Sequence, residues 1–197
     1  MPKTGESTLI ILAGGEAKRM GMPKHLIPAG EGTILDRQVA RLGPTFSETL
    51  VVGRGLTDGS AGARLVEDCF PERSPLVGIV SGLRAATTAW SLVIGCDMPD
   101  IHPDLPALLL EGANDADIDA VVPVVRGYYE PLCAAYRTTA IDAMESAIAC
   151  RHLKITAVYE TLRVRAIAEG MIRTVDTGLA SFANLNTAHD LQRAGLA

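Results

Sequence analysis

The sequence predicts an α/β protein with a Rossmann-like, three-layer α/β/α fold around a mainly parallel central sheet. Short apolar runs alternate with helix-like segments along the 197 residues, which is the pattern of successive βαβ units. Apolar residues make up 48% of the chain and aromatic residues only 4%. The core must therefore consist mainly of Ala, Val, Leu and Ile, as buried parallel strands require. At this length we expect one domain, residues 1–197.

In chain order, apolar runs predict strands and the segments between them predict helices. In the first part of the chain the expected elements are strand 8–12, helix 34–42, strands 49–53 and 64–66, helix 79–89, strand 92–96 and helix 105–112. In the rest they are strands 120–125 and 132–136, helices 138–149 and 155–162, strand 173–175 and helix 187–194. The segment 164–170 fits either a strand or a helix, because its periodicity does not separate the two.

The composition and the N-terminus argue against several classes of protein. The formal net charge of −5 disfavours a general nucleic-acid surface, which needs a basic face. The first residues, MPKTGEST, are polar and precede only a short apolar run, unlike a signal peptide. No stretch approaches the roughly 20 apolar residues of a membrane span. We therefore expect a soluble, cytoplasmic protein with neither nucleic-acid nor membrane partners.

The stretch ILAGGEAKRMGMPK places a glycine pair and three cations directly after the first apolar run. Ligands of open α/β sheets bind beyond the carboxyl ends of the strands, and Gly14 and Gly15 let the backbone approach a ligand closely. Lys18, Arg19 and Lys24 can neutralise a polyanion, so we expect a nucleoside triphosphate here. A solvated turn that carries a few surface cations is the alternative interpretation.

This loop is neither of two familiar phosphate-binding loops. A P-loop needs Gly-Lys followed by Ser or Thr, whereas Lys24 follows Pro23 and precedes His25. The spacing of the glycines also fails the dinucleotide fingerprint G-x-G-x-x-G.

A second candidate site lies at Asp97, where the buried-looking run SLVIGCDMPDI reaches its first charged residue. A carboxylate at the end of a buried strand can face the ligand crevice. Mg²⁺ favours one or two carboxylates together with phosphate oxygens and water, so we predict Asp97 as a magnesium ligand. The alternative is that Asp97 caps the turn that begins at Met98-Pro99.

Several motifs together resemble the MobA-like nucleotidyltransferases. LAGGEAKRMGMPKHLIP resembles the family signature L-A-G-G-x-x-x-R-M-G-x-x-K, and CDMP resembles its second motif. SFANLNTAHDL resembles the C-terminal motif F-x-N-x-N-T-P-E-D-L, with Ala188 and His189 in place of Pro and Glu. The resemblance runs from Leu12 to Leu191 and implies the fold of the nucleotide-diphospho-sugar transferases.

The resemblance implies the activity of a molybdenum cofactor guanylyltransferase. Such an enzyme transfers GMP from GTP to the phosphate of molybdopterin cofactor, with Mg²⁺ as cofactor, and releases pyrophosphate. Its partners would be GTP, molybdopterin cofactor and, transiently, molybdoenzymes or their chaperones. The nucleotide would occupy the N-terminal half, about 1–115, and the acceptor the C-terminal half, about 116–197. The acidic stretch 115–119 would separate the two halves.

The resemblance also assigns roles to residues at matching positions. Those implied to be catalytic are Arg19, Lys24 and Asp97, with Asp97 also holding the metal. Those implied to bind the nucleotide are Leu12, Ala13, Gly14, Gly15, Lys24, Asp68, Gly78 and Asp97. Those implied to bind the acceptor are Glu130, Asn184 and Asn186. A helix cap is the alternative role for both asparagines.

Two departures from the family pattern leave individual nucleotide contacts open. Ser74 stands where the family often has Gly, and Gly53-Arg54-Gly55 stands where relatives often carry an asparagine. Three alternative functions also stay open at this point. They are transfer to another acceptor, such as cobinamide phosphate or a sugar phosphate, transfer of CMP instead of GMP, and nucleotide binding without turnover. The sequence LAGG favours guanylyl transfer, because cytidylyl members resemble LAAG.

Overall fold

The computed structural model describes residues 3–14, 23–56, 60, 62–113, 117–185 and 190, with the backbone alone for Lys24. Its centre is an eight-stranded sheet in the order β10-β7-β9-β6-β1-β4-β5, with β8 paired to β7. The strands of this sheet are β1 (Thr8–Leu12), β4 (Glu48–Val52), β5 (Arg64–Val66), β6 (Trp90–Gly95), β7 (Ala120–Val125), β8 (Tyr128–Tyr129), β9 (Cys133–Arg137) and β10 (Val164–Ala168). A separate two-stranded sheet pairs β2 (Pro28–Ala29) with β3 (Gly32–Thr33).

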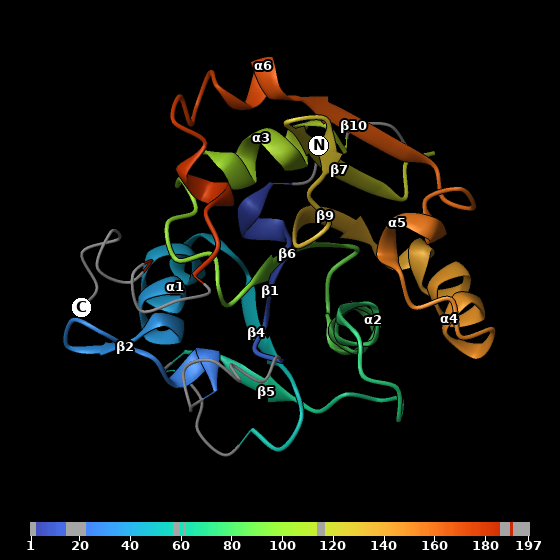
Figure 1. Ribbon diagram of the computed structural model, residues 1–197, viewed down its shortest axis with the longest axis horizontal. Coiled ribbons are helices and arrows are strands. Elements are labelled where there is room, and N and C mark those ends of the chain that lie inside the picture. Colours follow the sequence, from blue (N-terminus) through green and yellow to red (C-terminus); the bar gives the residue numbers. More distant parts are fainter. Residues whose placement is uncertain are drawn as a thin grey trace.

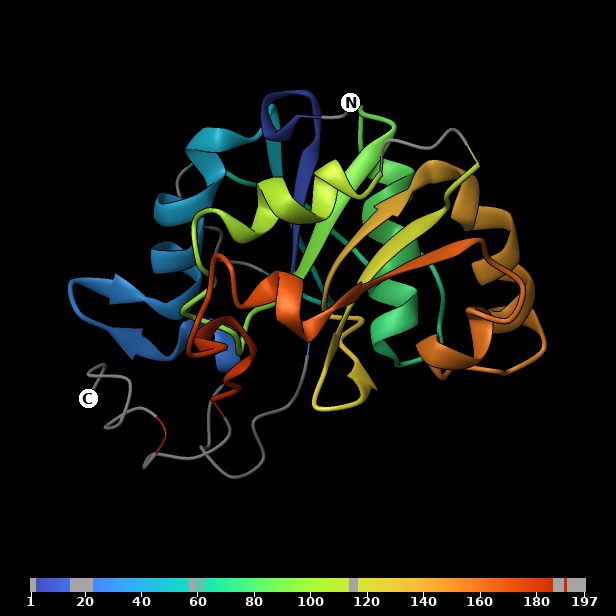
Figure 2. The same cartoon turned by 90° about the horizontal axis from the view of Figure 1, so that it is seen from above.

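Helices cover both faces of the sheet, which confirms the predicted three-layer fold. The helices are α1 (Ile34–Leu42), α2 (Pro75–Ala85), α3 (Leu105–Glu111), α4 (Ile141–Ala149), α5 (Ile155–Val158) and α6 (Glu169–Ile172). Helices α1 and α3 lie over one face, and α2, α4 and α5 lie over the other (Figures 1 and 2). Strand β1 alternates between the two cores, since Leu9 and Ile11 face the first and Ile10 and Leu12 face the second.

The direction of the strands brings several strand ends to one edge of the sheet. Strands β5, β4, β1 and β6 are parallel neighbours, and β7 is parallel to β10. Strand β9 is antiparallel to both β6 and β7, so β6 and β7 run in the same direction. The carboxyl ends of β1, β4, β6 and β7 therefore meet at the same edge, which we call the carboxyl edge.

Most predicted elements are present, and several match at both ends. Strands 8–12, 64–66 and 120–125 and helix 34–42 have the predicted bounds. Two other expectations differ in extent, because the predicted helix 155–162 is the short α5 and the ambiguous segment 164–170 is mostly β10. The predicted helix 187–194 lies almost wholly outside the described residues.

Helix α2 begins four residues before the predicted start at residue 79. Pro75 occupies its first turn, and the Ser74 side chain accepts a hydrogen bond from the backbone N–H of Val77. Both are favoured at helix N-termini. The segment 75–78, which ends at the predicted nucleotide-binding residue Gly78, is therefore the first turn of a helix.

The predicted strand 173–175 is wrong. The N–H of Thr174 donates to the carbonyl of Met171, and the N–H of Val175 donates to the carbonyl of Ile172. The chain thus continues in turns beyond α6, and these N–H groups are not available to a sheet. Its β-branched residues favoured a strand, but local hydrogen bonds determine the structure here.

Glu48, at the start of β4, links several segments at the edge of the sheet opposite to the carboxyl edge. Its Oε1 accepts hydrogen bonds from the N–H and hydroxyl of Thr87, both at 2.6 Å, and from the Thr8 hydroxyl at 2.9 Å. Its Oε2 lies 3.1 Å from Nη2 of Arg64. Burial alone would raise the pKa of Glu48, but the hydrogen bonds from Thr87, Thr8 and Arg64 prevail and lower it from 4.5 to about 2.

We expect Glu48→Gln to lower the free energy of unfolding at pH 7 by about 1–3 kcal/mol, since hydrogen bonds to a charged group are lost. The folded-state pKa is depressed, so this stabilisation is fully present above pH 4.5 and is lost as the pH falls towards 2. Urea unfolding of both proteins between pH 7 and pH 2 measures the difference. A difference that stays constant over this range would contradict the role of the Glu48 charge.

Candidate active site

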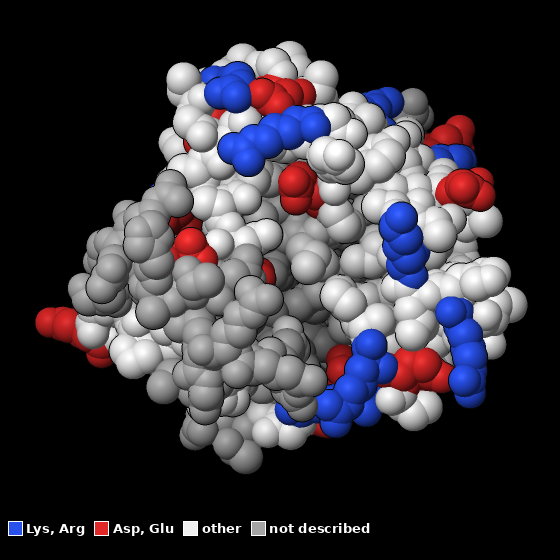
Figure 3. Space-filling model, in the orientation of Figure 1, with Lys and Arg blue, Asp and Glu red and all other residues white. Residues whose placement is uncertain are grey.

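Residues from separate sequence motifs meet at the carboxyl edge. Strand β1 leads into Ala13 and Gly14, and β6 leads into Asp97. Leu12 is in register with Val52 on one side and with Gly95 on the other. A hollow opens near the middle of this face of the molecule (Figure 3). Gly15 and Arg19 lie outside the described residues, and Lys24 begins a short 3-10 turn, Lys24–Leu26.

Asp97 lies in a tight turn directly after β6. The N–H of Met98 donates to the carbonyl of Gly95, and the N–H of Cys96 donates to the carbonyl of Leu12. A Cβ built on Gly95 would lie 2.6 Å from Oδ1 of Asp97, so the carboxylate occupies space that only glycine leaves open. The chain forms a turn here, and the next helix, α3, begins only at Leu105. The magnesium-binding and turn-capping interpretations of Asp97 both stay predictions.

Gln38 of α1 holds the Asp97 turn in place. Its Nε2 donates to the carbonyl oxygens of Gly95 and Met98, both at 2.9 Å, and the residue is only 1% exposed. Both partners are carbonyl oxygens, which can only accept, so the NH₂ group of the Gln38 amide must face them. Sequence reasoning missed Gln38, although a glutamine between the apolar residues Leu35 and Val39 was the available signal.

The C-terminal motif packs against the same turn. The N–H of Leu185 donates to the carbonyl of Asp97 at 2.8 Å. The Ser181 hydroxyl accepts from the N–H of His102 at 2.8 Å, and the carboxylate of Asp176 accepts from the N–H groups of Ala180 and Ser181. Asn184 is therefore held beside the Asp97 turn and is exposed. Asn186 lies outside the described residues.

Leu12, at the end of β1, lies close to two other predicted nucleotide-binding residues, Asp68 and Gly78. A Cβ built on Gly78 would lie 3.1 Å from Cδ2 of Leu12 and 3.9 Å from Oδ1 of Asp68. This oxygen of Asp68 is buried and accepts no hydrogen bond within the described structure. Burial raises the pKa of Asp68, and the hydrogen bond and charge of Arg54 oppose the shift.

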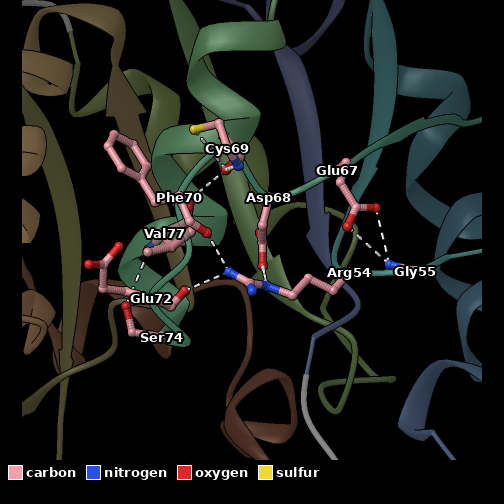
Figure 4. A network of polar contacts seen from close by, with 10 residues as sticks. Arg54, Gly55, Glu67, Asp68, Cys69, Phe70, Glu72, Ser74 and Val77 are labelled. Carbon is pink, nitrogen blue, oxygen red and sulfur yellow. Dashed lines mark hydrogen bonds and ion pairs between the residues drawn. The ribbon is translucent and has the colours of Figure 1, made fainter.

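Arg54, at the departure from the family pattern after β4, is the centre of a polar network (Figure 4). Its Nε lies 3.4 Å from Oδ2 of Asp68, and its Nη2 donates to the carbonyls of Phe70 and Glu72. The carboxylate of Glu67 accepts from the N–H of Gly55 at 3.1 Å. Arg54 thereby joins the loop after β4 to the loop that leads into α2. The sequence did not show this role.

Glu130 lies just beyond a tight hairpin at the end of β7. Arg126 and Gly127 form the turn with φ of 52° and 82°, and the N–H of Glu130 donates to the carbonyl of Pro123 at 2.9 Å. The residue is half-buried, and burial raises its pKa. The hairpin places Glu130 near the carboxyl edge, and its contact with the acceptor stays a prediction.

The described residues include no group of three or more His, Cys, Asp or Glu side chains placed to hold a metal. Among the described helices, none combines the length and the apolar character that crossing a membrane requires.

The chain is similar to proteins of one family over almost its whole length. Residues 9–183 match the family model described as MobA-like NTP transferase domain. A molybdenum cofactor guanylyltransferase from Desulfosudis oleivorans is 35% identical over 95% of this chain and 93% of the relative. A probable molybdenum cofactor guanylyltransferase from Pelotomaculum thermopropionicum is 33% identical over 96% of this chain and 92% of the relative.

This chain is also similar to solved structures of nucleotidyltransferases. Molybdopterin-guanine dinucleotide biosynthesis protein A from Archaeoglobus fulgidus superposes with a TM-score of 0.81 at 28% identity, over 95% of this chain and 96% of that one. A 2-C-methyl-D-erythritol 4-phosphate cytidylyltransferase from Thermus thermophilus has a TM-score of 0.69 at 18% identity, over 94% of this chain and 95% of that one, and shares the fold. The matched region extends from β1 past the Asp97 turn into the C-terminal motif, and the chain belongs to the MobA-like NTP transferase family.

Proposed function

We propose that this protein transfers GMP from GTP to the phosphate of molybdopterin cofactor, which forms molybdopterin guanine dinucleotide and releases pyrophosphate. The observation that carries the proposal is the meeting of the Asp97 turn with the C-terminal motif, through the hydrogen bond from Leu185 to Asp97. This arrangement occurs in a chain 35% identical to a molybdenum cofactor guanylyltransferase over nearly its full length. The nucleotide would lie over Leu12, Ala13 and Gly14, and the acceptor beside Glu130 and Asn184.

The reaction needs alignment and charge neutralisation more than it needs a nucleophilic side chain. The attacking group is a phosphate monoester with a second pKa of about 6, so it is already largely anionic at neutral pH. An oxygen of this phosphate forms a bond to the α-phosphorus of GTP while the bond to pyrophosphate breaks, with the two oxygens in line. Arg19 and Lys24 would neutralise the charge that develops on the leaving pyrophosphate.

The carboxylate of Asp97 fits a magnesium ion. It is held in the space left by Gly95, at the carboxyl end of a buried strand. A single carboxylate at this position suits Mg²⁺, which takes one or two carboxylates and completes its coordination shell with phosphate oxygens and water. When bound, Mg²⁺ would neutralise and orient the phosphates of the nucleotide.

The proposal is tested with purified protein, molybdopterin cofactor, Mg²⁺ and each of the four nucleoside triphosphates in turn. We expect pyrophosphate release and a dinucleotide product, with GTP the preferred donor. Preference for CTP would assign the protein to cytidylyl transfer. Absence of product with all four nucleotides, despite tight GTP binding, would favour a nucleotide-binding module without turnover.

Gly14→Ala is expected to reduce the preference for GTP over CTP without destabilising the fold. A Cβ built on Gly14 meets no atom of the described residues within 4 Å, so we expect the new methyl group to crowd a bound nucleotide. A purine that lies against this backbone would be disfavoured relative to the smaller pyrimidine, by about 1–3 kcal/mol at most. The ratio of kcat/KM for GTP and CTP measures the change, and thermal unfolding checks stability. An unchanged ratio would show that Gly14 does not contact the base.

Arg54→Ala is expected to raise the KM for GTP about tenfold, since a charge-assisted contact that positions Asp68 is lost. Arg64→Ala is the matched control. Arg64 also pairs with a carboxylate, Glu48, and donates to a carbonyl, that of Ala85, but Glu48 begins its strand at the opposite edge. The control should lower the melting temperature and leave the KM for GTP unchanged. Equal effects of both variants on KM would exclude a specific role for Arg54.

A further inference from the structure

Two tyrosines stand exposed on the hairpin between β7 and β8, at the carboxyl edge. Tyr128 is 75% exposed and Tyr129 is 42% exposed. Large exposed apolar side chains are few in the described part of the chain, and the others are Leu65 and Met171. The hairpin projects from the carboxyl edge beyond the ends of the neighbouring strands (Figure 2). Tyr128 is therefore a large aromatic surface at the edge where the substrates would bind.

The hairpin is held rigidly. The N–H of Arg126 donates to Oε2 of Glu169 at 2.8 Å. The ring of Tyr129 meets that of Tyr159 edge to face, with centroids 5.2 Å apart. The Tyr159 hydroxyl is hydrogen-bonded to that of Tyr136 at 2.7 Å, and the Tyr136 hydroxyl also donates to the carbonyl of Pro131. An aromatic side chain on such a support can bind a ligand at a low cost in ordering.

Strand geometry separates the side chains of the hairpin onto two faces. Successive residues of a strand point to opposite sides, and the hydrogen bond from the N–H of Glu130 to Pro123 continues the pairing one residue beyond β8. Tyr128 and Glu130 therefore share the side opposite to Tyr129. Tyr129 points towards Tyr159, in the core beneath α5. Tyr128 is paired with Val125, which belongs to the other core, where the C-terminal segment contributes Ile172 and Leu179.

The carboxylate of Glu130 is available to a ligand. It is half-buried, and within the described residues no side chain or backbone group donates a hydrogen bond to it. The charge of Arg126 acts on it from the turn of the hairpin. A partly desolvated carboxylate is a strong acceptor for neighbouring N–H groups that point in the same direction.

We propose that Tyr128 and Glu130 together bind the planar ring of a pterin, with Tyr128 stacked on its face and Glu130 accepting hydrogen bonds from its N–H and amino groups. A pterin carries a 2-amino-4-oxo edge, which presents two adjacent donors to a carboxylate. Stacking of a flat heteroaromatic ring on an aromatic side chain supplies the affinity. This inference rests on the proposed function, in which the acceptor contains a pterin, and it adds the residues that recognise the ring.

Fluorescence titration of the full chain with free pterin (2-amino-4-oxopteridine) and with lumazine (2,4-dioxopteridine) tests both contacts. Wild type should bind pterin more tightly than lumazine, because lumazine places an oxygen where pterin has its amino group. Tyr128→Ala should weaken the binding of both compounds about tenfold, and Tyr128→Phe should keep it. Glu130→Gln should remove the preference for pterin. Equal binding of pterin by wild type, Tyr128→Ala and Glu130→Gln would overturn the proposal.

Steady-state kinetics with molybdopterin cofactor separate this inference from the proposed function. Tyr128→Ala should raise the KM for the acceptor about tenfold and leave the KM for GTP unchanged. The control is Leu65→Ala, an exposed side chain on β5 at the far end of the sheet, and it should change neither value. An unchanged acceptor KM in an active Tyr128→Ala enzyme overturns the inference alone. If wild type makes no product with any nucleotide, the proposed function fails, and the pterin titration decides the hairpin site.

Discussion

Asp97→Asn is expected to lower turnover about a thousandfold, which corresponds to about 4 kcal/mol of lost transition-state stabilisation. The asparagine has nearly the same shape, so it still fits beside Gly95. The hydrogen bonds that hold the turn involve backbone carbonyls of Gly95, Asp97 and Met98, and they are unaffected by the change. The variant should therefore melt at nearly the wild-type temperature. What it loses is the negative charge at the end of β6, which would bind the proposed magnesium ion.

A carboxylate in the same turn provides the control. Asp100 is half-buried and pairs with Arg37 and Arg41 of α1 at 3.2 and 3.6 Å. Asp100→Asn removes one negative charge from the same region but should keep turnover near the wild-type level. Calorimetric titration with GTP, with and without Mg²⁺, gives a second measurement, in which Asp97→Asn should lose most of the effect of Mg²⁺ on affinity. Activity of Asp97→Asn at ordinary Mg²⁺ concentrations would refute the assignment.

Features that local sequence encodes were predictable. Strand β1 and helix α1 have the predicted bounds because an apolar run and a helix-like segment identify them without knowledge of the rest of the chain. Asp97 could be named as a candidate for the same reason, since a charged residue directly after a buried run is visible in the sequence. The family resemblance then linked Asp97 to Asn184, and the structure brings their two segments together through Leu185.

Features that depend on distant contacts were not predictable. The antiparallel direction of β9 is set by pairing with β6 and β7, and no residue within β9 specifies it. Arg54 meets its partners at Asp68, Phe70 and Glu72 only because two loops converge at the carboxyl edge. The two tyrosines of the hairpin directly precede Glu130 in the sequence, but their exposure depends on the turn at Arg126 and Gly127.

Gln38→Met is expected to raise the Mg²⁺ concentration for half-maximal activity about tenfold or more, as the loss of a residue that supports a metal ligand commonly does. Methionine keeps the length and volume of the side chain, so packing within α1 should persist. The carbonyls of Gly95 and Met98 would lose the donor that both share. The side chain at position 38 would then no longer hold the turn that contains Asp97. Turnover at saturating Mg²⁺ should fall less than the apparent affinity for Mg²⁺, because excess metal partly restores the bound state.

Gln38→Met should change the free energy of unfolding only modestly, although it changes the Mg²⁺ requirement strongly. Two buried carbonyls lose a donor, which is unfavourable, but Oε1 of Gln38 is itself buried without a hydrogen bond from the described residues. Its removal offsets part of the loss, so we expect a net destabilisation of about 1–2 kcal/mol. Val39→Ala, at the next position of α1 and also buried, is the control, since it removes packing and leaves the Asp97 turn untouched. Urea unfolding and Mg²⁺ titration of both variants separate the two roles. If both variants need more Mg²⁺ in proportion to the stability that they lose, Gln38 is a structural residue. If only Gln38→Met needs more Mg²⁺, Gln38 is the residue that positions Asp97.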